Sequence, residues 1–299
     1  MPIGARATVL LTTLAVAPPA YYAVHTAHRL EAKYPRLQPS DDSTSTPALR
    51  TPDFPITHHT PHVDIYGGKV PARALADYYA SDDDGRHGHP LSPHEAWARF
   101  FLESPALRLE GRLFGGFSTR NHGDAGERGF HPGQKLLNGV LEVVRAPSPS
   151  SSSPSSSSSL LSSRFLRPIA AAVALPTTTT PQPLLVRWTC PPAAVGFFHT
   201  AAVRWGYPWR LMSGGRHEFA VVSDGEPDAE GLVEVRFGCA HDYERVAEEG
   251  KDQQKTIPGW VARLHRVYAM WLLDERIEAL KRWAAAAEEA EAAGPEGGR

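Results

Sequence analysis

The sequence predicts an α+β fold in which a curved antiparallel sheet wraps on a long C-terminal helix. Within residues 232–240, Val233, Val235 and Phe237 alternate with charged residues, as in a strand with one buried face. Residues 259–283 repeat apolar side chains at steps of three and four, which is the period of an amphipathic helix. Antiparallel strands and one such helix bury a two-layer core.

The charge balance narrows the classes of partner. The 299 residues include 31 basic and 33 acidic residues, for a formal net charge of −2. A general nucleic-acid binder carries a basic domain or stripe, so we expect no nucleic-acid partner. Two cysteines exclude a disulfide scaffold and a zinc site built from several cysteines. The sequence lacks the common nucleotide-binding, α/β-hydrolase and zincin motifs, and we expect no cofactor.

The N-terminus is predicted to attach the protein to a membrane. Residues 7–24 carry no charged side chain, and about 20 apolar residues span a bilayer. Tyr21, Tyr22 and the basic residues that follow are typical of a membrane interface. We therefore expect residues 1–30 to form a single-pass hydrophobic anchor in a membrane of unassigned compartment. The alternatives are a cleaved signal peptide, a mitochondrial presequence and a short buried or disordered leader.

Two segments of low complexity divide the rest of the chain. Residues 31–61 are rich in Pro, Ser, Thr and Asp and are predicted to be a disordered tether. Residues 146–183 contain runs of Ser, Pro and Thr, which cannot bury enough apolar area to offset the entropy of ordering. Because strand-like segments flank this run, we interpret it as an insert within one domain over residues 62–285. Residues 286–299 are predicted to be a disordered tail.

The elements of that domain follow in order. A strand is expected at 62–70. Ser92 can cap a helix over residues 92–104, with Pro93 at its first position and Glu95 completing a capping box. The long helix begins after Pro258. Between the helices, β-forming residues separated by turn residues predict strands or strand-like segments over 137–145, 184–190, 196–205, 209–223 and 232–240.

Two groups of histidines are candidate metal sites. One consists of His58, His59 and His62, and the other of His87, His89 and His94. Imidazole is a proper ligand for zinc and other transition metals. The spacing matches no known site and both segments resemble loops, so we predict no metal site.

Two other histidines are candidates for catalysis. His217 shares one side of its strand with Phe219, so it lies in a cavity if that side faces inward. His241 is followed by Asp242, and a histidine beside a carboxylate can act as a general base. Neighbours on a strand point to opposite faces, however, so these two side chains need not meet.

Large apolar side chains of the strands and the long helix are candidate ligand contacts. The alternative is ordinary core packing, since aromatic residues at helical spacing usually pack. Cys190 and Cys239 lie on predicted strands, where they form a disulfide if the strands are neighbours in an oxidising compartment and otherwise remain buried thiols. The candidate contacts are Trp205, Trp209, Phe219, Phe237, Trp260, Leu264, Tyr268 and Trp271.

Several stretches resemble the START and Bet v 1-like superfamily of helix-grip proteins, which bind hydrophobic ligands. They are DIYGGKVP (64–71), EAWARFFLESPALRLEG (95–111), WRLMSGGRHEFAV with VEVRFGCAH (209–241) and PGWVARLHRVYAMWLL (258–273). The pattern is similar to uncharacterised members from fungi and bacteria. The resemblance implies a helix-grip fold with a lipid-like or polycyclic ligand between sheet and helix. It implies no catalytic residue, because the superfamily includes carriers, cyclases and proteins of no known activity.

Three functions are consistent with the sequence. The first is a membrane-tethered protein that binds a hydrophobic small molecule or lipid in a cavity between sheet and helix. The second is a cyclase or dehydratase acting on a polyketide-like substrate of secondary metabolism, with His217 or His241 as acid or base. The third is a non-catalytic adaptor. The sequence leaves open whether the protein is an enzyme. A cavity separates the first two from the third, and a buried His–carboxylate pair in it separates the second from the first.

Overall fold

The computed structural model describes residues 21–38, 47–80, 91–114, 126, 129–147 and 182–293. A helical segment covers residues 21–33. The other helices are α2 (Pro47–Arg50), α3 (Ala72–Ala80), α4 (Pro93–Leu102), α5 (Pro105–Phe114), α6 (Pro192–Arg204) and α7 (Gly259–Ala293). The strands are β1 (His58–Pro71), β2 (Lys135–Leu136), β3 (Leu141–Arg145), β4 (Leu184–Thr189), β5 (Gly214–Val221) and β6 (Leu232–Glu244). Short 3-10 helices are η1 (Leu137–Gly139), η2 (Val222–Gly225) and η3 (Ala247–Glu249).

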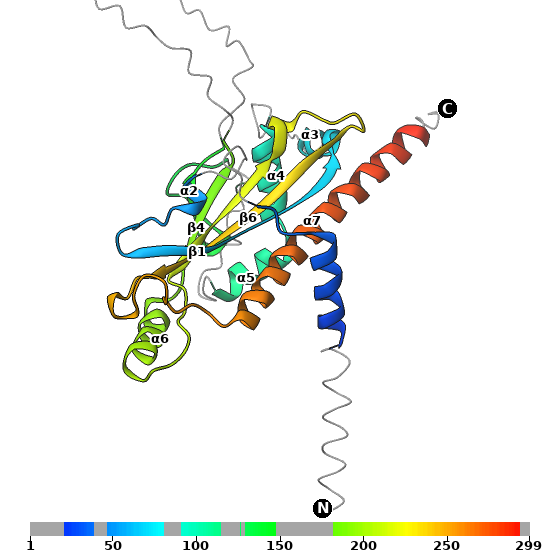
Figure 1. Cartoon of the computed structure of the whole chain (residues 1–299). Coiled ribbons are helices and arrows are strands. Elements are labelled where there is room, and N and C mark those ends of the chain that lie inside the picture. Colours follow the sequence, from blue (N-terminus) through cyan, green and yellow to red (C-terminus); the bar gives the residue numbers. More distant parts are fainter. Residues whose placement is uncertain are drawn as a thin grey trace, which may run out of the picture.

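The fold is α+β, with one open antiparallel sheet and a long C-terminal helix. The six strands lie in the order β1-β6-β5-β4-β3-β2. All neighbouring strands are antiparallel, and β1 pairs with β6 from His58 opposite Glu244 to Pro71 opposite Leu232. Figure 1 shows α7 running along the sheet, beside the helix of residues 21–33.

The main core lies between the inner face of the sheet and the helices. Alternation along β5 and β6 turns Phe219 and Phe237 to this face, where the ring of Phe101 from α4 packs against both at 5.1 and 4.5 Å. From α7, Ile277 and Leu280 enter the same cluster and are fully buried. The burial expected from the alternation of residues 232–237 is therefore confirmed.

The outer face carries a small apolar cluster and several ion pairs. Leu49 of α2 packs on Ile65, Leu185 and Ala240. Beside it, the buried Arg216 donates to Asp242 at 2.6 Å. Farther along the strands, Arg145 pairs with Glu218 and Arg187 with Glu142. A charge buried without a partner is costly, so the pair with Asp242 allows Arg216 to lie under α2, where it also donates to the Ala48 carbonyl at 3.1 Å.

Residues 21–38 are part of the folded unit, in contrast to the tether expected from residue 31. Leu30 and Tyr34 are buried in the main core. The Lys33 ammonium and the Tyr34 hydroxyl donate to Asp274 of α7 at 2.5 and 2.8 Å. Burial raises the pKa of Asp274, but these hydrogen bonds outweigh that effect and hold it below its usual value.

The segment after this helix lies along the edge strand of the sheet. The Leu37 amide donates to the Ile65 carbonyl of β1 at 2.9 Å. Helix α2 and the start of β1 likewise fall within the expected tether of residues 31–61. The low-complexity composition concealed these contacts, because each depends on one or two apolar residues.

Three further elements differ from the sequence expectation. Residues 196–205, expected to be strand-like, form most of α6, which Pro191 and Pro192 begin and two alanine pairs favour. Residues 137–139 form η1 ahead of β3, with Asn138 at a positive φ of 59°. Helix α7 continues to Ala293, so residues 286–293 of the expected tail are helical.

The start of the helix after Ser92 agrees with the expectation, whereas the helix ends at Leu102 and Glu95 binds Arg99 in place of the expected capping-box contact. The Ser92 hydroxyl accepts a hydrogen bond from the Glu95 amide at 3.2 Å, which caps α4. The Glu95 carboxylate binds Arg99 one turn later, at 2.6 Å.

The predicted anchor is only partly covered by the structure. Residues 7–20 lie outside the described residues, as do residues 148–181 of the insert and 294–299 of the tail. In the part of the chain that is described, no helix is both long enough and apolar enough to cross a membrane.

The packing of Leu30 predicts that the N-terminal helix contributes to stability. Leu30→Ala should lower the free energy of unfolding by about 2–5 kcal/mol, since it opens a cavity against α7. Val24→Ala, on the same helix but 53% exposed, should change it by no more than about 0.5 kcal/mol. Urea denaturation followed by circular dichroism measures both. Equal, small effects would show that this helix does not pack on the core.

Candidate functional site

A cavity lies between the inner face of the sheet and α7. Its volume is about 570 Å³. Strands β3 to β6 supply one side, and α5, η1 and α7 supply the other. Most of the lining is apolar or aromatic. The residues are Phe101, Leu107, Glu110, Gly111, Leu137, Asn138, Gly139, Val140, Leu141, Trp188, Thr189, Cys190, Pro191, Met212, His217, Phe219, Phe237, Cys239, His265, Tyr268, Ala269 and Leu272.

The register of β5 and β6 sets the sheet side of the cavity. His217 and Phe219 point to the inner face. On the outer face, Arg216 pairs with Asp242 and Glu218 pairs with Arg145. Directly opposite on β6, Cys239 faces His217 and Phe237 faces Phe219. The inward position of His217 follows from the strand alternation, as expected.

Helix α7 and helix α5 enclose the other side. Tyr268 and His265 lie one turn apart on α7 and both line the cavity. The Tyr268 hydroxyl donates to Glu110 of α5 at 2.6 Å. Burial and this hydrogen bond raise the pKa of Tyr268, so the hydroxyl stays protonated. The bond links the two helices across the cavity wall.

Two imidazoles line the cavity and a third lies next to them. We name His217, His241 and His265 the histidine cluster. The rings of His241 and His265 are 4.4 Å apart between centroids, in an edge-to-face arrangement. The centroid of the Trp188 ring lies 6.1 Å from that of His217 and 6.2 Å from that of His241, so the indole contacts two rings of the cluster.

A glycine makes room for the tryptophan of this cluster. A side chain on Gly215 would start 2.8 Å from Cζ2 of Trp188 and 2.1 Å from the carbonyl oxygen of Ala240. Both distances are too short for a carbon contact. Gly215 therefore allows the indole to lie flat across β5, between His217 and His241.

The histidine cluster is uncharged in the folded protein. Burial lowers the pKa of His217 to about 3 and that of His241 to about 2, and it also lowers the pKa of His265. The mutual repulsion of the three, once protonated, acts in the same direction. The cluster thus presents neutral rings to the cavity.

Three ring nitrogens of the cluster, and that of the adjacent Trp188, have no hydrogen-bond partner among the described residues. They are Nδ1 of His217, Nε2 of His241, Nε2 of His265 and Nε1 of Trp188. His217 also bonds to the Gly238 backbone through its ring. Buried polar atoms without partners are uncommon in folded proteins, so each one needs an explanation such as a bound water, an ion or a functional role. The structure records no hydrogen bond from these imidazoles to a carboxylate in the part of the chain that it describes.

The candidate residues from the sequence separate into two groups. Phe219, Phe237, Tyr268 and His217 line the cavity, and His241 lies behind Trp188 and His265. The remaining candidates are on the surface. Trp205 and Trp209 follow the exposed helix α6, and Trp260, Leu264 and Trp271 lie on the side of α7 opposite its buried residues. Exposed fractions are Trp205 67%, Trp209 36%, Trp260 62%, Leu264 59% and Trp271 40%.

Sequence reasoning missed some of the lining. Cys239 and His265 were not proposed as contacts, although Cys239 follows Phe237 by the two residues that keep it on the same face. Both cysteines are free, with Cys239 buried and Cys190 half-buried. Burial raises the pKa of each thiol, which disfavours the thiolate.

The other histidine groups have structural contacts. Nδ1 of His59 bonds to the Tyr243 carbonyl at 3.1 Å, and Nδ1 of the buried His94 accepts from the Val221 amide at 3.0 Å. His87 and His89 lie outside the described residues. Within the described residues, no three His, Cys, Asp or Glu side chains are placed to hold a metal ion.

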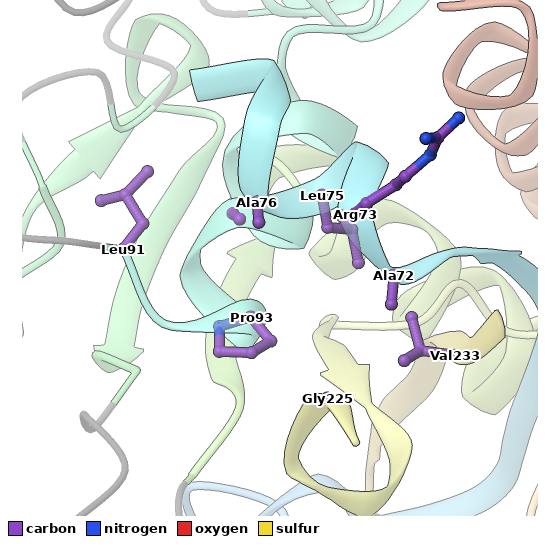
Figure 2. A pocket seen from close by; sticks show the side chains of 9 residues that line it. Ala72, Arg73, Leu75, Ala76, Leu91, Pro93, Gly225 and Val233 are labelled. Atoms are coloured by element: carbon purple, nitrogen blue, oxygen red, sulfur yellow. The ribbon is translucent and has the colours of Figure 1, made fainter. Parts of the chain in front are cut away.

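A smaller pocket lies beside α3 and α4. It measures about 320 Å³ and is lined by small apolar residues such as Ala72, Leu91 and Pro93. Figure 2 shows the Arg73 side chain extending away from it toward α7, where it pairs with Glu288. Because no polar group of this lining is free to orient a ligand, the larger cavity is the better candidate.

Comparison with protein-family models, with curated proteins and with solved structures finds no match to this chain. The site must therefore be interpreted from its own geometry.

The depressed pKa values predict acid sensitivity. Unfolded histidine binds a proton near pH 6.5, whereas folded His217 does so only near pH 3. Between these values the unfolded state binds more protons, so the free energy of unfolding should fall as pH decreases from about 6.5 toward 3. His217 alone contributes up to about 1.4 kcal/mol per pH unit.

Urea denaturation at several pH values tests this. His217→Gln should reduce the slope of stability against pH, while Thr189→Val, at the exposed rim of the same cavity, should keep it. A wild-type slope in the His217 variant would mean that the folded imidazole titrates normally.

Proposed function

We propose that the protein binds a hydrophobic small molecule or lipid in the cavity between the sheet and α7. The observation that carries this proposal is a cavity of about 570 Å³ whose wall is mostly apolar and includes a few polar groups. Ligand pockets typically measure about 300–1,000 Å³ and combine these two properties. Ordinary core packing leaves few voids larger than a water molecule.

The polar groups of the wall favour an uncharged ligand. The histidine cluster is neutral, and the carboxylate of Glu110 already accepts the Tyr268 hydroxyl. An anionic ligand would be buried without a counter-charge, which is costly, and a cationic ligand would meet only the Glu110 carboxylate, which already accepts from Tyr268. The ligand we propose is thus an apolar molecule, lipid-like or polycyclic, without a formal charge.

The fold and the membrane attachment belong to the same proposal. We take the sheet to be curved around α7 in a helix-grip arrangement, as the resemblance to the START and Bet v 1-like superfamily implies. Support comes from the position of the cavity between these two elements. Residues 7–24 would hold the protein in a membrane, with mitochondria as the alternative location, and the exposed Tyr21 and Tyr22 support an interface at their end.

A cyclase or dehydratase activity is the second candidate. Unprotonated imidazoles near an apolar cavity favour it, because a general base must be free to accept a proton. A base is most effective when its pKa lies near the working pH, however, and His217 and His241 have pKa values of about 3 and 2. The geometry therefore supports binding better than catalysis.

Native mass spectrometry of the full-length protein, with organic extraction of bound compounds, tests the proposal. A co-purifying uncharged lipid or polycyclic compound is expected. An empty protein that also fails to take up hydrophobic fluorescent probes would contradict binding and leave the adaptor as the better hypothesis.

A substitution that fills the cavity should abolish binding. Ala269 is buried on α7 and lines the cavity, so Ala269→Phe should project a ring into it and reduce ligand or probe uptake at least about tenfold. Ala285→Phe, at an exposed position of the same helix, is the matched control and should bind normally. Fluorescence titration measures both, with circular dichroism to verify folding. Unchanged uptake by the Ala269 variant would place the ligand elsewhere.

A further inference from the structure

An aromatic surface on and after α6 is not used by the proposed ligand site. We name Phe197, Phe198, Trp205, Tyr207 and Trp209 the α6 aromatic surface. Their rings form a continuous series, from Trp205 through the two phenylalanines and Tyr207 to Trp209, with centroid separations of 5.3–6.2 Å. Phe197 is 56% exposed and Trp205 is 67% exposed.

Helix α6 is apolar on the side that faces solvent as well as on the side that is buried. Its buried residues are Val195, Ala201 and Ala202, all of them small. Phe197 is larger and remains exposed, as does Val203. A surface helix of a soluble domain normally directs polar residues outward, and large exposed apolar patches mark interaction sites. This helix is thus built to contact something apolar.

The segment that forms this surface carries no acidic residue of its own, and the acidic group beside it is Glu244 of β6, which lies 3.5 Å from His199 of α6. Residues 191–209 contain no aspartate or glutamate, and the exposed charged residue among them is Arg204. Tryptophan and tyrosine concentrate where a bilayer meets water, because their rings have an apolar body and a polar edge. Arginine beside them is attracted to anionic lipid headgroups.

Other exposed apolar groups lie toward the same end of the molecule. In Figure 1, α6, the first turns of α7 and the beginning of the helix of residues 21–33 all lie low in the view, below the sheet. The start of α7 carries Trp260 and Leu264, which are 62% and 59% exposed. Tyr21 and Tyr22, 73% and 72% exposed, begin the N-terminal helix, directly after the uncharged residues 7–20.

We propose that α6 and residues 205–209 lie in the surface of a lipid bilayer that contains anionic lipids. The helix has 13 residues and is about 20 Å long, too short to cross a bilayer core of about 30 Å. It lies parallel to the membrane, with its aromatic surface at the headgroup level. This contact is separate from residues 7–24 and does not depend on the proposed ligand.

The orientation also places the cavity near the lipid. Thr189, Cys190 and Pro191 line the cavity, and α6 begins at the next residue. Pro191, the N-cap residue of α6, is therefore part of the cavity wall.

Hydrogen exchange of the full-length protein tests this contact separately from the N-terminal segment. Exchange is followed by mass spectrometry with phosphatidylcholine vesicles, with and without phosphatidylserine. Vesicles should slow exchange over residues 191–209, more strongly with phosphatidylserine and less at high salt. Peptides of the β5–β6 turn, residues 222–231, serve as the internal reference and should not change.

A matched pair of substitutions separates the membrane from other partners. Val203→Glu places a charge on α6, at a position 45% exposed, and should abolish vesicle-induced protection of residues 191–209. Val144→Glu makes the same change on β3, at a position 36% exposed, and should preserve it. Absence of vesicle-induced protection in the wild type would overturn the proposal. Protection that instead rises with protein concentration, without vesicles, would also overturn it, because it assigns the surface to a second copy of the chain.

Discussion

The pairing of β1 with β6 is the constraint on which the rest of the structure depends. The two strands are far apart in the chain, yet they are in register from His58 opposite Glu244 to Pro71 opposite Leu232, with one irregularity. This pairing turns β6 into an internal strand, with β5 on its other side. It also aligns Tyr66, Phe237 and Phe219 across the inner face, where α4 and α7 cover them. The cavity lies where the helical cover is incomplete.

Helix α7 depends on the same pairing and in turn holds the N-terminal helix. At Gly68 of β1, an added side chain would start 2.6 Å from the Cδ1 atom of Ile277, so the glycine permits close contact between strand and helix. One turn earlier on α7, Asp274 accepts hydrogen bonds from Lys33 and Tyr34. Residues 274–277 of α7 thus contact both β1 and the helix of residues 21–33. Neither contact can be predicted from the local sequence.

The sequence predicted burial correctly in the strands, where side chains alternate between two faces. Alternation predicted that Val233, Val235 and Phe237 are buried and that His217 shares the face of Phe219, and the structure confirms both. The helical spacing was misleading for α7, because Trp260 and Trp271 were expected to face the sheet and instead lie on the exposed side. The buried stripe follows smaller residues such as Ala269, Leu273 and Leu280, because the sheet approaches closely there.

The α6 region shows a second limit of pattern reading. Aromatic and β-branched residues at 196–205 indicated a strand, since strands are rich in them. Two prolines before the segment, and alanines within it, favoured a helix instead. Its apolar outer side cannot be interpreted by burial rules for soluble domains, because that side packs on nothing in the described structure.

The short contact between Leu37 and Ile65 has a consequence for self-association. β1 is an edge strand of 14 residues, and a long bare edge is a template for pairing with another chain. The Leu37 amide and the Arg36 guanidinium occupy the carbonyls of Ile65 and Val63. The opposite edge, β2, has only two residues and offers little to pair with. Proteolytic loss of the N-terminal helix would therefore do more than remove a possible anchor: it would uncover an aggregation-prone edge.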